Sequence, residues 1–243
     1  MREFTDEEWA IADARKDKIL EKWFGPCAPI CQHAVINYEM GGPLDAHFYP
    51  RSRYGGTLVV SKDLVDPKFS SPKNKTFNAF ELAMATRRPL PPAYFKNGTD
   101  VEKESDPEFE KFVERAIAAM TTIGRYVQYQ CPINRFETLE FPQDYDEPEL
   151  AGRCFVFDAV GTPKKSGFSL GRALKGLFGN PETPPAPQGG SVDVDDVGFG
   201  ILIMIEVFRD EMNRAREEGV EGFLQRMKQA GRWPFSDLDR PQI

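Results

Sequence analysis

The chain has little of what marks a disulfide-rich, membrane-spanning or nucleic-acid-binding protein. Its 243 residues include only 4 Cys and 2 His, too few for a disulfide framework. The longest apolar run, 201–205, is far shorter than the roughly 20 residues of a membrane span. The net charge of −7 leaves no excess of basic side chains for phosphates or for an anionic membrane surface. We therefore expect neither a nucleic acid nor a membrane as partner.

Motifs for nucleotide binding and for hydrolysis are also missing. The sequence has no GxxxxGK[ST] loop, no GxGxxG between a strand and a helix, no HExxH pair and no GxSxG turn. We therefore expect no cofactor, and an enzyme is not the favoured interpretation. Residues 1–10 are acidic and carry no apolar stretch typical of a secretory signal, so reduced thiols and a cytoplasmic location are expected.

Aromatic content and helix signals indicate a folded core. Phe, Tyr and Trp make up 12% of the chain, which argues against disorder. Thr5 and Glu8 fit a capping box for a helix that ends at Gly25. A second helix is predicted to begin at Asp106, with apolar residues at helical spacing over 109–123, and a last helix over 209–230.

Short runs of β-branched and aromatic residues between glycines predict strands. These predicted strands are 33–38, 44–49, 57–61, 135–141, 154–160 and 199–208. The segment 77–86 stays open, because its composition favours a helix while its alternation of large and small residues favours a strand. Since strands cluster along the chain, we expect a single α+β domain over 1–243, with a mainly antiparallel or mixed central sheet flanked by helices.

One stretch, 161–191, differs from the rest in composition. Basic residues such as Lys164 and Lys175 precede a run rich in proline and glycine. Such a composition is typical of an exposed, mobile insertion, and we expect 164–191 to be dispensable for folding.

Three polar side chains form a candidate pocket. Asp45 and His47 alternate along a predicted strand and so share a face, which Glu81 joins if 77–86 is a strand. Two carboxylates and an imidazole could exchange protons, so a small-molecule-binding protein or a hydrolase is the alternative function. The simpler interpretation is a set of satisfied polar groups within a sheet.

A second group, Cys27, Cys31 and His33, carries potential metal ligands. Thiolates and imidazoles bind zinc, but this spacing is not that of a common zinc site. No metal is assigned, and whether the group binds one stays open.

The segment 233–240 is unusual for a C-terminal tail. Trp233 and Phe235 carry apolar area that water disfavours, while Asp237, Asp239 and Arg240 can pair with charged groups. We expect the segment to dock on the body and to border any groove that binds a partner.

Five segments, in order, resemble bacterial Suppressor of fused-like domains. They are 41–50 (GGPLDAHFYP), 56–61 (GTLVVS), 80–86 (FELAMAT), 205–212 (IEVFRDEM) and 233–240 (WPFSDLDR). The chain departs from the family in its insertion at 161–191 and in having Trp233 and Phe235 where the family tail has tyrosines. The resemblance implies an α+β domain in which 77–86 is a strand.

The resemblance also implies a function. The animal member restrains a transcription factor in Hedgehog signalling, and bacterial members include suspected immunity proteins that neutralise toxins. No catalytic residues come with this family. We therefore expect a non-enzymatic protein-binding module. An immunity protein is one such module, and the acidic charge of the chain suits a basic toxin as its partner.

Overall fold

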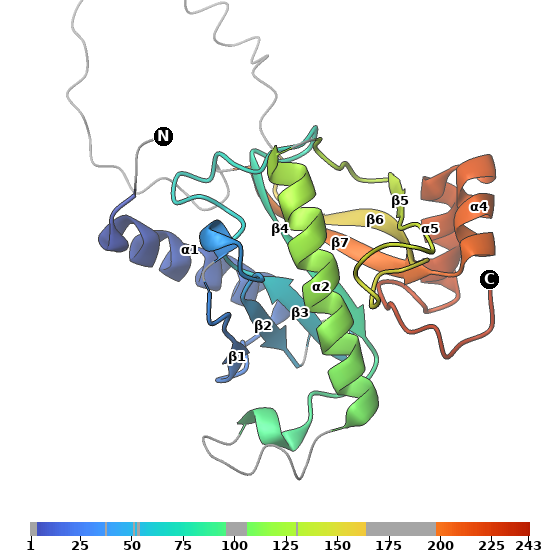
Figure 1. Ribbon diagram of the computed structural model, residues 1–243, viewed down its shortest axis with the longest axis horizontal. Coiled ribbons are helices and arrows are strands. Elements are labelled where there is room, and N and C mark those ends of the chain that lie inside the picture. The colour runs from blue at the N-terminus through green and yellow to red at the C-terminus, as the bar shows by residue number, and fades with distance from the viewer. Residues whose placement is uncertain are drawn as a thin grey trace, which may run out of the picture.

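The structure is a computed structural model that describes residues 4–36, 38–50, 52, 54–95, 106–129, 131–163 and 198–243. Within these residues a seven-stranded mixed sheet has helices on both faces, as Figure 1 shows. The predicted α+β fold is confirmed. The part of the expected mobile insertion that starts at 164 lies outside the described residues.

The elements follow the chain in a simple order of helix, strands, helix, strands and a final pair of helices. They are α1 (Asp6–Phe24), β1 (Cys31–Gln32), β2 (Ala46–Tyr49), β3 (Thr57–Ser61), β4 (Ala79–Thr86), α2 (Pro107–Tyr129), β5 (Thr138–Glu140), β6 (Cys154–Gly161), β7 (Phe199–Val207), α4 (Arg209–Glu218) and α5 (Val220–Gln229). Short 3-10 helices cover Tyr38–Met40 and Pro92–Phe95. None of the helices in the described residues has the length and apolar content needed to cross a membrane.

The sheet consists of two antiparallel halves joined by one parallel seam. Its strand order is β1-β2-β3-β4-β7-β6-β5, and β1 to β4 follow one another in sequence. Strands β4 and β7 run parallel, in a register that extends from Ala79 opposite Phe199 to Ala83 opposite Ile203. Both strands are buried along their whole length, which explains the nearly continuous apolar run of β7.

The helices cover the two faces of the sheet unequally. Helix α2 packs on one face, against Phe80, Leu82 and Met84 of β4, and residues of the two 3-10 helices join it there. Helices α1, α4 and α5 pack on the other face, where β4 presents Ala83 and Ala85. The segment 77–86 therefore forms a strand, as its alternation of large and small residues predicts, and not the helix that its composition favours. Successive side chains of a strand point to opposite faces, so the large ones pack under α2 and the small ones under the other helices.

Three predicted elements need correction. The strand expected at 33–38 is wrong, since β1 stops at Gln32, the described residues 33–36 belong to no strand, and Tyr38 begins a 3-10 helix. The strand expected at 135–141 shortens to β5. The helix expected at 209–230 is broken by Gly219, whose φ of 95° is a conformation that favours glycine. By contrast, β3 has the predicted bounds, and α1 has the predicted capping box.

Candidate functional site

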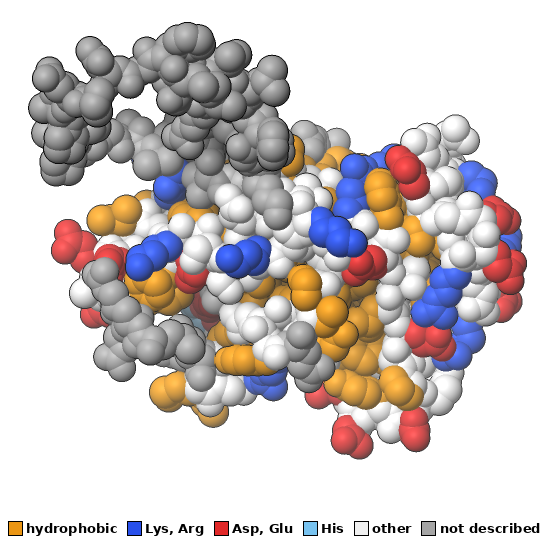
Figure 2. Space-filling model, turned by 90° about the horizontal axis from the view of Figure 1, so that it is seen from above, with side chains coloured by type: hydrophobic (Ala, Val, Ile, Leu, Met, Phe, Trp, Pro, Cys, Tyr) orange, Lys and Arg blue, Asp and Glu red, His pale blue; other side chains and the backbone are white. Residues whose placement is uncertain are grey.

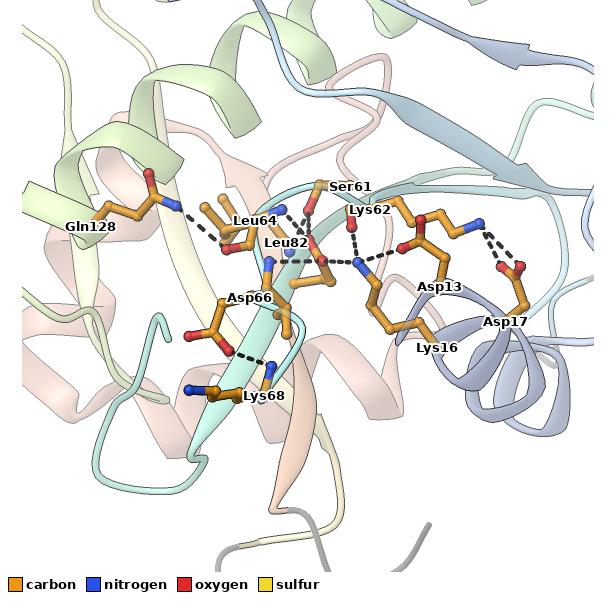
Figure 3. A network of polar contacts seen from close by, with 12 residues as sticks. Asp13, Lys16, Asp17, Ser61, Lys62, Leu64, Asp66, Lys68, Leu82 and Gln128 are labelled. Carbon is orange, nitrogen blue, oxygen red and sulfur yellow. Dashed lines mark hydrogen bonds and ion pairs between the residues drawn. The ribbon is translucent and has the colours of Figure 1, made fainter. Parts of the chain in front are cut away.

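Glu81 lies in β4 and is fully buried in a polar network. Figure 3 shows this network, with Lys16, Ser61 and Leu64 among its labelled residues. Its carboxylate accepts a 2.6 Å hydrogen bond from the Ser61 hydroxyl and bonds from the backbone N–H groups of Leu64 and Val65. The Lys16 ammonium of α1 lies 3.5 Å away and also donates to the Lys62 carbonyl. The Lys16 contact ties α1 to the sheet, those of Leu64 and Val65 tie the chain after β3 to it, and that of Ser61 joins β3 to β4. Glu81 is therefore a satisfied structural group.

Asp45 belongs to a different cluster, on the edge formed by β1 and β2. Cys31 pairs with His47 across these antiparallel strands, and continuing the register places His33 beside Asp45. Opposite residues in a ladder share a face, as do residues two apart, so all four side chains lie on one face of the edge. The shared face follows from the β1–β2 register. The sequence did not predict it, because the strand was expected at 33–38 and not at Cys31–Gln32.

Cys31, His33 and Asp45 form a continuous chain of contacts. The Cys31 Sγ lies 2.8 Å from His33 Nε2, and His33 Nδ1 contacts an oxygen of Asp45. The other Asp45 oxygen accepts the Ala34 N–H at 2.9 Å. Burial raises the pKa of the Cys31 thiol, and the Asp45 carboxylate raises it further. The resting group is thus a protonated thiol with an imidazole next to it.

His47 faces a different thiol. Its Nδ1 lies 3.8 Å from Cys27 Sγ. Burial lowers the pKa of His47 to about 4, with a further contribution from the Lys62 ammonium, so the ring is neutral at physiological pH. The candidate ligands Cys27, Cys31 and His33 are thereby divided between two pairs. Across the described residues, no three His, Cys, Asp or Glu side chains are arranged to hold a metal ion.

A hollow of about 550 Å³ lies between α1 and the β1–β2 edge. It is lined by Asp6, Trp9, Asp13, His33, Ala34, Tyr38, Asp45 and Asp63. Burial, together with the nearby Asp45 and Glu81 carboxylates, raises the pKa of Asp63 to about 6. Of the three residues predicted to share a pocket, only Asp45 lines this one. The structure does not bring Asp45, His47 and Glu81 together as an acid–base group.

The tail segment docks on the body, as expected. Phe235 is 7% exposed and forms a parallel bridge with Ala85 at the end of β4. Ser236 inserts between the ends of β4 and β7: its N–H donates to the Ala85 carbonyl, and its hydroxyl accepts the Glu206 N–H at 3.1 Å. Beside it, the Trp233 ring packs edge-on against Tyr54. These contacts close the gap where the parallel strands separate.

The charged residues of the tail pair with groups on the body. The Asp237 carboxylate accepts bonds from the Thr86 hydroxyl and the Arg87 N–H. Arg240 donates to both oxygens of Glu211, at 2.7 and 2.8 Å, and Asp239 lies 3.6 Å from Arg88. Hollows of about 250 and 190 Å³ border the tail, but larger ones lie beside α1 and α2.

Two adjoining hollows, of about 430 and 570 Å³, run along the outer side of α2. They share Thr122, Arg125 and Glu147, and we call them together the α2 trough. Its apolar lining includes Ile117, Ala118, Tyr126, Tyr129, Leu139, Phe141 and Tyr145. Figure 2 shows the molecule from above, relative to the view of Figure 1. A band of hydrophobic side chains crosses this face, with acidic side chains at its lower edge.

The rim of the α2 trough is acidic. Glu114, Glu147 and Glu149 line it, and Asp144 and Asp146 lie on the same loop as the two latter residues. Within the described part of the chain, these five carboxylates make no ion pair. Sequence reasoning missed this surface, because its apolar residues come from α2, β5 and the loop after β5, and no spacing rule shows that these three elements pack side by side.

Comparison with protein-family profiles and with curated proteins finds no match. The resemblance to Suppressor of fused-like domains therefore stays a prediction.

Proposed function

We propose that the chain is a non-enzymatic protein-binding module that binds a basic protein segment in the α2 trough. The observation that carries the proposal is a trough with aromatic and aliphatic side chains in its lining and three carboxylates, Glu114, Glu147 and Glu149, at its rim. Asp144 and Asp146 lie on the adjoining loop, and none of these five carboxylates makes an ion pair within the described residues. Unpaired surface carboxylates increase the rate of encounter with a positively charged partner, and a buried aromatic centre supplies most of the affinity of protein interfaces.

The lining offers suitable anchor sites. Tyr129 is 77% exposed at the end of α2. Tyr145 packs on Phe141 with ring centroids 4.8 Å apart, which holds one wall of the trough in place. Tyrosine is enriched at protein interfaces because its ring buries apolar area while its hydroxyl can still form hydrogen bonds. A partner with aliphatic or aromatic side chains between Lys or Arg residues fits this surface.

The resemblance to Suppressor of fused-like domains supports the same class of function. We propose further that the basic partner is a toxin, such as a nuclease, and that this chain neutralises it as an immunity protein. A cytoplasmic location fits that role. The alternative of a pocket formed by Asp45, His47 and Glu81 has no supporting observation, because Lys16 and Ser61 already satisfy Glu81.

The proposal can be tested by selecting random phage-displayed peptides on the wild-type protein. We expect the selected peptides to combine Lys or Arg with large apolar residues. The variant Glu147→Lys/Glu149→Lys should weaken their binding at least about tenfold, because two attractive charges become repulsive ones.

A matched variant, Glu217→Lys/Glu221→Lys, makes the same change of net charge at exposed positions of α4 and α5 that are not in the trough. It should keep its affinity within about twofold, since screened distant charges contribute little. Equal losses in the two variants would mean that net charge alone drives binding. That result, or a selection that yields no enriched peptide, would refute the proposal.

A further inference from the structure

The contacts of His33 join a thiol to a carboxylate through the two nitrogens of one imidazole. Nδ1 faces the Asp45 carboxylate and Nε2 faces the Cys31 sulfur, at 2.8 Å. A carboxylate at Nδ1 holds the proton on that nitrogen, which leaves the lone pair of Nε2 free to accept a proton from the thiol. A nucleophile, a base and a group that orients the base are the three parts of an activated nucleophile.

Asp45 is itself held in place. The Ala34 N–H donates to its second oxygen at 2.9 Å, so the carboxylate contacts the ring with one oxygen and the backbone with the other. His33, by contrast, is 67% exposed at its side chain and is therefore open to a ligand.

The other three cysteines have no comparable arrangement. Cys131 is exposed, and among the described residues its sulfur contacts the neighbouring Pro132 carbonyl, at 3.8 Å. Cys154 is buried. Cys27 lies 3.8 Å from His47, a longer separation than that between Cys31 and His33. Cys131 can therefore serve as an internal reference for an ordinary exposed thiol.

The hollow beside the Cys31 cluster favours positive charge. Its lining includes His33 and Asp45 together with Asp6, Asp13 and Asp63, and Trp9 adds an aromatic ring. Carboxylates attract an ammonium or guanidinium group, and the face of a Trp ring does the same. The cationic Lys16 forms an ion pair with Asp13 and also attracts Asp63, so it offsets part of the negative charge of this lining.

We propose that Cys31 is a nucleophilic thiol, that His33 is its base and Asp45 the residue that orients His33, and that its substrates are cationic disulfides held by the acidic hollow. The Cys31 sulfur attacks one sulfur of the substrate while the thiol proton moves to His33 Nε2. The new S–S bond forms as the substrate S–S bond breaks, and the departing thiolate takes the proton from His33. The products are a mixed disulfide on Cys31 and a free thiol.

Burial and the Asp45 carboxylate raise the pKa of the Cys31 thiol, so little thiolate is present at neutral pH and the reaction depends on a proton acceptor. His33 Nε2, 2.8 Å from the sulfur, is placed to be that acceptor. This inference is independent of the proposed function, because the hollow and the α2 trough share no lining residue.

The experiment compares two probes, cystamine, which is cationic, and 3,3′-dithiodipropionate, which is anionic. Mixed disulfides at each cysteine are measured over time by peptide mass spectrometry. With cystamine, we expect Cys31 to react at least about tenfold faster than Cys131, a modest value for general base catalysis. His33→Gln should remove that advantage without changing the rate at Cys131, and its exposed position leaves the core intact.

Asp45→Asn tests the orienting role, and it should lower the rate at Cys31 while thermal unfolding remains cooperative. Asp6→Asn/Asp63→Asn tests the hollow, and it should reduce the preference of Cys31 for cystamine over 3,3′-dithiodipropionate. The same preference measured at Cys131 should not change. A Cys31 rate no greater than that of Cys131, or one that His33→Gln leaves unchanged, would overturn the proposal. An equal rate with the two probes would overturn its cationic specificity.

Discussion

The Lys16 ammonium and the Glu81 carboxylate lie 3.5 Å apart, and neither side chain is exposed. Burial alone would lower the pKa of Lys16, but the Glu81 and Asp13 carboxylates outweigh it and raise that pKa. Lys16 is therefore charged in the folded protein. Their contact joins the first helix to the centre of the sheet.

Lys16→Met should destabilise the protein strongly, because it leaves the Glu81 charge buried without its counterion. Breaking a buried pair in this way typically costs about 3–5 kcal/mol. Urea unfolding measures the loss, with Lys18→Met, an exposed lysine on the same helix, as the control. Adding Glu81→Gln to Lys16→Met should recover much of the loss. A single variant as stable as the control would contradict the assignment.

Asp63→Asn should stabilise the protein at neutral pH. The pKa of Asp63 is raised to about 6, from an ordinary 3.8, so the folded state binds its proton more tightly than the unfolded chain does. This carboxyl therefore favours folding below about pH 4 and loses that contribution as the pH rises through 6.

Asparagine keeps the shape without the charge, so the gain should be on the order of 1 kcal/mol near pH 7.5, after allowing for partial exposure. It should be smaller near pH 4.5. Chemical unfolding at both values tests the sign, and Asp144→Asn, at an exposed and unpaired position, supplies the control. A gain that grows towards acid would refute the expectation.

Truncation after Gly231 should lower the melting temperature by several degrees. It removes buried Phe235 and the Ser236 bonds between β4 and β7. A loss of even 1 kcal/mol shifts a domain of this size by roughly 2–4 °C. Differential scanning calorimetry provides the measurement. A truncated protein that melts within about a degree of the full chain would show that docking contributes nothing to stability.

Gly200→Ala should destabilise the seam between β4 and β7. A Cβ at Gly200 would lie 2.3 Å from the Phe77 ring, well inside contact distance. Overpacking of a core typically costs about 1–3 kcal/mol. The double variant Gly200→Ala/Phe77→Leu should recover part of this loss, because the smaller side chain makes room for the methyl group. Gly222→Ala, where a Cβ meets nothing within 4 Å, should show no such loss.

Local signals in the sequence predict much of the fold. The Thr5–Glu8 capping box and the strand at 57–61 are confirmed because neighbouring residues alone determine them. The break at Gly219 was missed, since apolar spacing continues across it and only the backbone conformation reveals it. The docked tail was predicted from its apolar area, whereas the insertion of Ser236 between two strands depends on tertiary structure.

The candidate sites were harder to predict than the fold. For Glu81 we expect a satisfied polar group within a sheet, with acid–base chemistry as the alternative, but the sequence does not identify its partner. Lys16 comes from a helix 65 residues away in the sequence, and no spacing rule connects the two. His33 and Asp45 are 12 residues apart and meet only because of the β1–β2 register. Strand pairing across a turn cannot be read from a segment whose secondary structure was itself predicted incorrectly.

The parallel seam has a consequence for synthesis of the chain. Strand β4 pairs with β3 along one edge, but its other edge can pair only after β7 has been synthesised. Ala79 of β4 pairs with Phe199 of β7, 120 residues further along the chain. At roughly 5–20 residues per second, β4 waits about 6–24 s on the ribosome with one edge unpaired. An apolar strand with an open edge is prone to aggregate. The yield of folded protein should therefore depend more on the rate of translation and on chaperones than the stability of the finished sheet suggests.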